Sequence, residues 1–66
     1  DSPEERALET MGLHLPLDPK ELRERYLSLV KEHHPDVNRE DPGAEERLKD
    51  INDAYRTLLA GLRTLG

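Results

Sequence analysis

Residues 22–38 read LRERYLSLVKEHHPDVN, and this stretch decides the fold. Its apolar residues recur at helical spacing and share an arc of about 100°, counted at about 100° per residue. The members of this face are Leu22, Tyr26, Leu29, Val30 and His33. Pro35 disfavours the helical conformation at His34, so the helix is expected to end near His33. The stretch therefore predicts an amphipathic helix followed by a loop that opens with His34-Pro35-Asp36.

The start of this helix is marked by a capping residue followed by proline, and the same signal occurs at two other places. The three pairs stand at residues 2–3, 18–19 and 41–42. A Ser or Asp side chain accepts hydrogen bonds from the first free amides of a helix, and proline suits the first helical position. Gly12 is a natural stop for the first helix. The sequence thus predicts helices over residues 3–11, 19–33 and about 42–63.

The third helix, like the second, is predicted to carry one apolar face. Its members are Ala44, Leu48, Ile51, Tyr55, Leu58, Leu59 and Leu62. Two long amphipathic helices bury such faces by packing antiparallel, with the short first helix laid across them. The apolar connector 13–17 is expected to lie against the core, and the loop 34–41 is longer than most helix–helix connections. We expect an all-α fold in a single domain over residues 1–66.

The composition favours a binding module over an enzyme. The chain has 66 residues, of which 33% are hydrophobic, and it contains no Cys, Trp or Phe. A chain of this size buries too little core to enclose a catalytic pocket, and without Cys it has neither disulfides nor a thiolate metal site. No apolar run approaches the ~20 residues of a membrane span. Because the chain opens with Asp1 rather than Met, we expect it to be a piece of a longer protein.

The charges are unevenly distributed. The net charge is −5, which argues against nonspecific binding to nucleic acid or to an anionic membrane. Residues 19–34 nevertheless carry four Lys or Arg against three Glu, while the rest of the chain carries six against twelve acidic residues. One strip of the second helix combines Lys20, Arg23, Leu27 and Lys31. This strip is either a docking surface for an acidic partner or a mixed-charge face that only keeps the helix soluble.

Three other functions find little support in the residues. His33, His34 and Asp36 invite a metal site, but adjacent residues project about 100° apart and no second His pair completes a ligand set. Hydrolysis by a His-Asp pair lacks a Ser, Thr or Lys in a nucleophile setting. A DNA-binding helix-turn-helix needs a turn of about 3–4 residues and a basic recognition helix, whereas the third helix carries as many acids as bases.

The stretch 22–38 resembles the second helix and signature loop of J-domains, the co-chaperone modules of the DnaJ family. Residues 44–58, AEERLKDINDAYRTL, look like the next helix of that family in the same register. Residues 7–13, ALETMGL, match the end of its opening helix in the position of Gly12. The His-Pro-Asp tripeptide is weak evidence alone. Its place between a helix with Tyr26 and a helix with Ile51, Ala54 and Tyr55 makes the resemblance specific.

The resemblance implies a module that docks on the ATP state of a DnaK-type (heat shock protein 70) chaperone and stimulates ATP hydrolysis by that partner, in protein folding and the stress response. The domain itself is then not an enzyme and needs no cofactor. The implied partner-binding residues are His34, Pro35, Asp36, Arg23, Tyr26, Leu27, Asn38, Leu48 and Lys49. We expect a cytoplasmic monomer without nucleic-acid binding or direct membrane contact.

Physical reasoning gives the triplet residues distinct roles. Pro35 fixes the exit of the loop, and Asp36 is a short-armed anion that suits an Arg on the partner. His34 either braces the loop or donates a hydrogen bond, and the sequence leaves both open.

The chain also departs from the family pattern. Leu27 and Ser28 stand where many relatives have consecutive basic residues, and Leu48 stands where Phe is frequent. Ala7 and Leu8 replace aromatic residues that are common in the first helix, and the basic fourth helix of many relatives is absent or cut off. We therefore expect less electrostatic and more apolar docking. The alternative is a J-like scaffold that binds its partner without stimulating the ATPase. Lacking a Gly/Phe-rich segment and a zinc-binding region, this stretch is not expected to hold clients alone.

Overall fold

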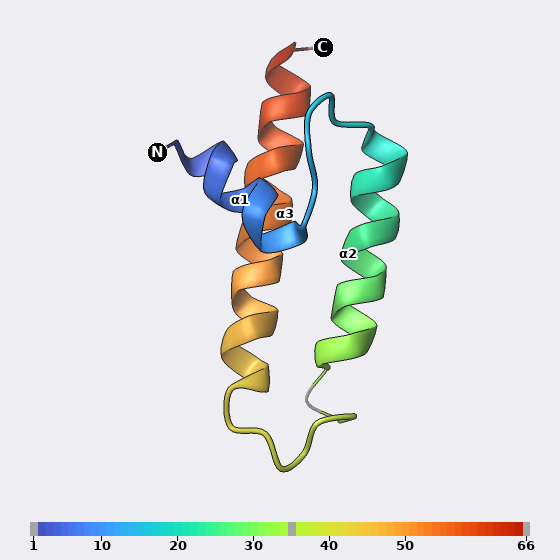
Figure 1. Cartoon of the computed structure of the whole chain (residues 1–66), viewed down its shortest axis with the longest axis vertical. Helices are drawn as coiled ribbons and strands as arrows, with labels where there is room; N and C mark the ends of the chain where they lie inside the picture. Colours follow the sequence, from blue (N-terminus) through green and yellow to red (C-terminus); the bar gives the residue numbers. More distant parts are fainter. Residues whose placement is uncertain (1, 35, 66) are drawn as a thin grey trace.

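The computed structural model describes the backbone of residues 2–34 and 36–65 and their side chains up to Arg63. It contains three helices, α1 (Pro3–Met11), α2 (Pro19–His33) and α3 (Ala44–Leu65), and no strand in the described residues. Figure 1 shows α2 and α3 side by side, joined by the loop at one end of the molecule. α1 packs mainly against α3 and only slightly against α2. The predicted all-α fold is confirmed.

The bounds of α1 and α2 agree with the prediction because the capping signals operate as expected. Ser2 Oγ accepts a hydrogen bond from the Glu5 amide at 3.2 Å, and Asp18 Oδ1 accepts one from the Lys20 amide at 2.9 Å. Gly12 has a left-handed backbone, with φ of 69°. Its amide and the next one donate back into the last turn of α1, which is the Schellman arrangement that ends helices at glycine.

α3 begins two residues later than predicted, at Ala44. The signal at Asp41 and Pro42 does not open the helix, because the Asp41 side chain folds a turn instead. Its Oδ1 accepts a hydrogen bond from the Gly43 amide at 2.9 Å, and its carbonyl oxygen accepts one from the Ala44 amide at 3.2 Å. Asp41 also contacts the Arg47 guanidinium on the first turn of α3. The end of α3 at Leu65 lies two residues beyond the predicted one.

The core lies where the three helices meet. Its buried members are Ala7, Met11, Leu13, Leu22, Ile51, Ala54 and Leu58. Ala54 is absent from the predicted apolar face of α3 and is buried because α1 crosses there. The connector follows the prediction only in part, since Leu13 is buried while Leu15 is 73% exposed. No helix in the described part of the chain is apolar over a length that could cross a membrane.

The turn at Asp41 predicts a pH dependence of stability. The hydrogen bond from the Gly43 amide, and then the one from Arg47, lower the pKa of Asp41 below its usual range. A carboxyl group with a lowered folded-state pKa stabilises the fold above its unfolded pKa of about 3.9, and this contribution is lost as the pH falls through the folded value. The difference in melting temperature between the native domain and Asp41→Asn should therefore be present at neutral pH and shrink below about pH 4. A constant difference across an acid titration would contradict this assignment.

Candidate functional site

The loop after α2 begins with a brace between His34 and Asp36. His34 leaves the helix with an extended backbone, at φ −64° and ψ 136°. Its Nδ1 accepts a hydrogen bond from the Asp36 amide at 3.2 Å. A nitrogen that accepts in this way carries no proton, so the neutral ring has its proton on Nε2. The approach of Asp36 Oδ2 to Nδ1 at 3.7 Å is therefore not an ion pair while this hydrogen bond is formed.

The brace turns the two side chains towards solvent. The His34 side chain is 45% exposed and the Asp36 side chain is 85% exposed. The Asp36 carboxylate is thus free to meet a cation on another molecule, and His34 Nε2–H remains as a donor. Of the two roles left open for His34, the geometry supports bracing the loop. Pro35 lies outside the described residues.

Asn38 ties the loop back to the end of α2. Its side-chain amide donates to the carbonyl oxygen of Glu32 at 2.9 Å and to that of His34 at 3.1 Å. Its backbone amide also donates to the His34 carbonyl, at 3.1 Å. The last carbonyl groups of a helix lack hydrogen-bond donors within the helix, and Asn38 donates to two such groups at the end of α2. This half-buried residue holds the triplet in register with α2, and its predicted contact with a partner stays a prediction.

Removing this tie is expected to loosen the loop more than it destabilises the domain. Asn38→Ala leaves two carbonyl groups with weaker partners, at a cost of about 1–2 kcal/mol. Hydrogen exchange at the amides of Asp36, Val37 and Asn38 should accelerate about tenfold or more, since a change of about 1.4 kcal/mol is a factor of ten. Amides in the middle of α3 should change little. The exposed neighbour Arg39 supplies the control, Arg39→Ala, and equal acceleration in both variants would contradict the role given to Asn38.

Tyr26 joins the middle of α2 to α3. Its ring stacks on Tyr55, with centroids 4.1 Å apart and planes at 16°, and its hydroxyl donates to Asn52 Oδ1 at 2.6 Å. Asn52 and Tyr55 were not among the predicted site residues, although a polar residue next to an apolar helix face is a recognisable signal. Tyr26 thus positions the second helix, and its side chain is only partly buried.

The remaining predicted residues lie on α2 and α3. Arg23 and Leu27 are exposed on α2, and Leu27 reaches 54%. On α3, Leu48 is half-buried and Lys49 is exposed. Lys20 and Lys31 are exposed as well, so the strip predicted from the sequence faces solvent along α2. The strip thus lies on α2, and the braced triplet lies in the loop that follows α2.

Comparison with known proteins decides the family. The DnaJ domain family matches residues 7–61, which is most of the chain. The chain belongs to the DnaJ domain family. Membership makes this DnaJ domain a co-chaperone module of the general kind that works with heat shock protein 70 chaperones.

Several curated relatives resemble this DnaJ domain. It is 50% identical over 48 residues to the Chaperone protein DnaJ of Acaryochloris marina, covering 73% of this chain and 13% of that protein. It is 42% identical over 50 residues to the Chaperone protein DnaJ of Halothermothrix orenii, covering 76% and 13%. It is 43% identical over 54 residues to the DnaJ homolog subfamily C member 5B of Sus scrofa, covering 82% and 27%. The chain therefore spans a small part of these relatives. No solved structure gives a significant match.

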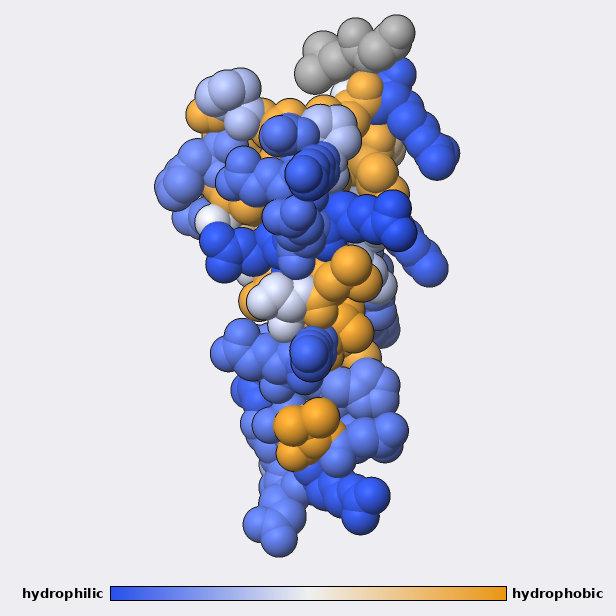
Figure 2. Space-filling view, turned by 90° about the vertical axis from the view of Figure 1, so that its right-hand side faces the viewer, coloured by the Kyte–Doolittle hydropathy of each residue, from blue (hydrophilic) through white to orange (hydrophobic). Residues whose placement is uncertain are grey.

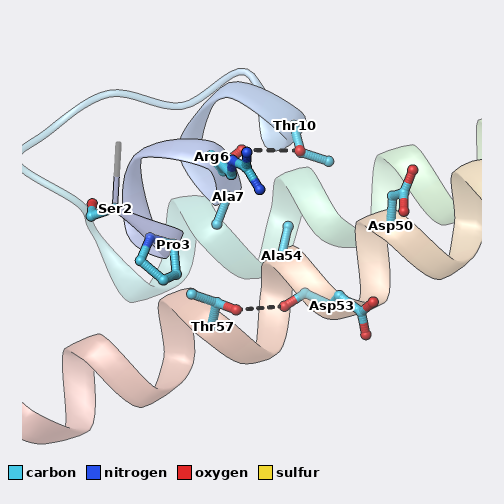
Figure 3. A pocket seen from close by; sticks show the side chains of 9 residues that line it. All are labelled: Ser2, Pro3, Arg6, Ala7, Thr10, Asp50, Asp53, Ala54 and Thr57. Carbon is cyan, nitrogen blue, oxygen red and sulfur yellow. Dashed lines mark hydrogen bonds between the residues drawn. The ribbon is translucent and has the colours of Figure 1, made fainter.

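The described residues that line the groove between α1 and α3 do not indicate a second functional site. Figure 3 shows Ala7 and Ala54 facing each other across it, where two small residues let the helices approach closely. The hydroxyls of Thr10 and Thr57 donate to carbonyl oxygens of their own helices, at 3.0 and 2.9 Å. Among the described residues, no three His, Asp or Glu side chains are grouped so that they could hold a metal ion. The braced loop remains the candidate site.

Proposed function

We propose that this DnaJ domain docks on a DnaK-type chaperone in its ATP state and stimulates ATP hydrolysis by that chaperone. The observation that carries the proposal is the Asp36 carboxylate, which belongs to a side chain that is 85% exposed. The backbone of the same residue is held by the hydrogen bond from its amide to the His34 ring. An exposed anion with a fixed backbone loses little freedom when it pairs with an Arg on a partner. The loop therefore presents an exposed carboxylate on an ordered backbone, as binding to a cation of another protein requires.

The proposed docking surface carries cations along α2 and a carboxylate in the loop. It consists of the triplet His34–Asp36 and of the α2 residues Arg23, Tyr26 and Leu27, with Asn38, Leu48 and Lys49 at its edges. Exposed Lys and Arg side chains along α2 favour an acidic area on the chaperone and speed the encounter. The single carboxylate of Asp36 then selects a cation at the end of that area. The docking surface thus presents cations along α2 and one carboxylate in the loop that follows the helix.

The chemistry belongs to the partner in this proposal. The DnaJ domain supplies no reacting group in this proposal, and its effect is to favour the chaperone conformation that hydrolyses ATP. A ligand shifts a conformational equilibrium only through a difference in its affinity for the two states. The native domain must therefore bind the ATP state more tightly than the ADP state. We place the domain in the cytoplasm and propose that it acts as a monomer.

A scaffold that binds without stimulating is the second candidate function. It is favoured by one observation: the exposed residues Leu27, in the middle of the strip, and Ser28, next to it in the sequence, are both uncharged. Weak electrostatic docking could leave the triplet near the chaperone without engaging it.

Titration of the native domain into a DnaK-type chaperone during steady-state ATP hydrolysis separates the two candidates. The co-chaperone proposal expects the rate to rise with domain concentration and to saturate. Binding detected by fluorescence anisotropy without any rise in the rate would favour the scaffold. No binding to either nucleotide state would reject both.

A further inference from the structure

Three large apolar side chains are exposed among the described residues: Leu15 (73%), Leu27 (54%) and Val37 (70%). Single exposed apolar residues are common on protein surfaces and need no explanation. Two of these three, however, flank the triplet: Leu27 lies on α2 before it, and Val37 follows Asp36 directly in the loop. Leu15 lies on the connector at the opposite end of α2. A shared binding role would explain why Leu27 and Val37 are both exposed on the two sides of the triplet.

Helix geometry places Leu27 on the same side as the triplet. Residues seven apart fall on one face of an α-helix, and they are separated by about 10 Å along its axis. His34 follows Leu27 by seven residues and is the first residue beyond α2. Lys31 lies between them on the same face. Leu27 therefore lies about two turns before His34 on the surface that ends at the loop.

Backbone hydrogen bonds hold Val37 on the other side of the triplet. Its amide donates to the His34 carbonyl oxygen at 3.0 Å, and the amide of Asn38 donates to the same oxygen. The Asn38 side chain closes this turn. Val37 is therefore fixed within one turn of His34 while its side chain stays in solvent. A β-branched side chain on a fixed backbone has few rotamers to lose when it is buried.

We propose that Leu27 and Val37 are two apolar anchors of the docking surface, which fit apolar spots on an acidic area of the DnaK-type chaperone. The inference rests on the proposed function and names what the docking surface recognises besides charge. Figure 2 looks onto the α2 side and shows apolar patches separated by hydrophilic surface. The cations Lys20, Arg23 and Lys31 lie in line with Leu27 on α2, and one anion, Glu24, borders this line. The matching partner surface is therefore apolar at the anchors and mainly acidic along the line of cations.

The test compares Leu27→Ser and Val37→Ser with the native domain, and Leu15→Ser serves as the matched control. The Kd for the ATP-bound chaperone is measured at about 50 mM and about 500 mM salt, because salt screens charge pairs and leaves apolar contacts largely intact. Each anchor variant is expected to raise the Kd about five- to tenfold at both salt concentrations, as burial of a partly exposed Leu or Val would give. Leu15→Ser is expected to bind as the native domain does. Circular dichroism checks that all variants fold.

The outcomes distinguish this inference from the proposed function. If the native domain stimulates the chaperone and both anchor variants bind as well as Leu15→Ser, the anchors are refuted and the proposed function stands. An effect of the anchor substitutions that disappears at high salt would also overturn the inference. If the native domain does not bind the chaperone at all, both proposals fail.

Discussion

Replacing Asp36 with Asn is expected to lower the stimulation of chaperone ATP hydrolysis by at least about thirtyfold. The quantity is the initial slope of the hydrolysis rate against domain concentration. Asn has nearly the shape of Asp, so the brace between the residue 36 amide and His34 Nδ1 should survive while the negative charge is lost. Truncating one member of a hydrogen-bonded charge pair that is buried on binding costs about 2–5 kcal/mol, and about 1.4 kcal/mol corresponds to tenfold.

The control is the same substitution at an exposed aspartate that is not part of the proposed docking surface. Asp50 lies on α3, beside the groove with α1 (Figure 3), and Asp50→Asn changes the net charge by the same amount. This variant should keep the native slope. A similar decrease in both variants would show that the total charge of the domain matters and that the position of Asp36 does not.

The largest effect on stability is expected at Leu22. This α2 side chain is fully buried, with 0% exposure, and it lies in the core shared by the three helices. Truncation of a buried Leu to Ala removes apolar contacts and leaves a cavity, which costs about 2–5 kcal/mol. Domains gain only about 0.05–0.15 kcal/mol of stability per residue, so this loss is a large share of the total for a chain of 66 residues.

Thermal unfolding followed by far-UV circular dichroism measures the effect. Each 1 kcal/mol shifts the melting temperature of a small domain by about 4–8 °C, so Leu22→Ala should melt at least about 8 °C below the native domain. Leu15→Ala makes the same chemical change at a side chain that is 73% exposed, and it should shift the melting temperature by no more than about 4 °C. Equal shifts would mean that the helices do not meet around Leu22.

The helices were predictable because their signals are local. Ser2 and Asp18 cap the first amides of α1 and α2 through their own side chains, and Gly12 ends α1 with a left-handed backbone. Each of these interactions spans only a few residues, so residue type and spacing are enough to find it. The start of α3 was misplaced because Asp41 can cap a helix or close a turn. The contact with Arg47, six residues away, favours the turn.

The candidate site was predictable in its position and less so in its internal bonds. The triplet and the strip on α2 follow from the sequence. The hydrogen bond from Tyr26 to Asn52 joins residues 26 positions apart, so it requires the packed helices. The bonds from the Asn38 amide to Glu32 and His34 likewise depend on the path of the loop, which a run of polar residues does not specify. The exposure of Val37 also depends on the path of the loop, so the sequence pattern does not predict it.

The most direct test of the central claim is single-turnover ATP hydrolysis by a DnaK-type chaperone, with the native domain and with His34→Gln. The ring of His34 accepts the hydrogen bond that sets the Asp36 backbone, and the flexible Gln side chain cannot hold that geometry rigidly. We predict that the native domain accelerates hydrolysis and that His34→Gln, folded to the same extent, does not. Acceleration by His34→Gln equal to that of the native domain would contradict the role of the braced loop.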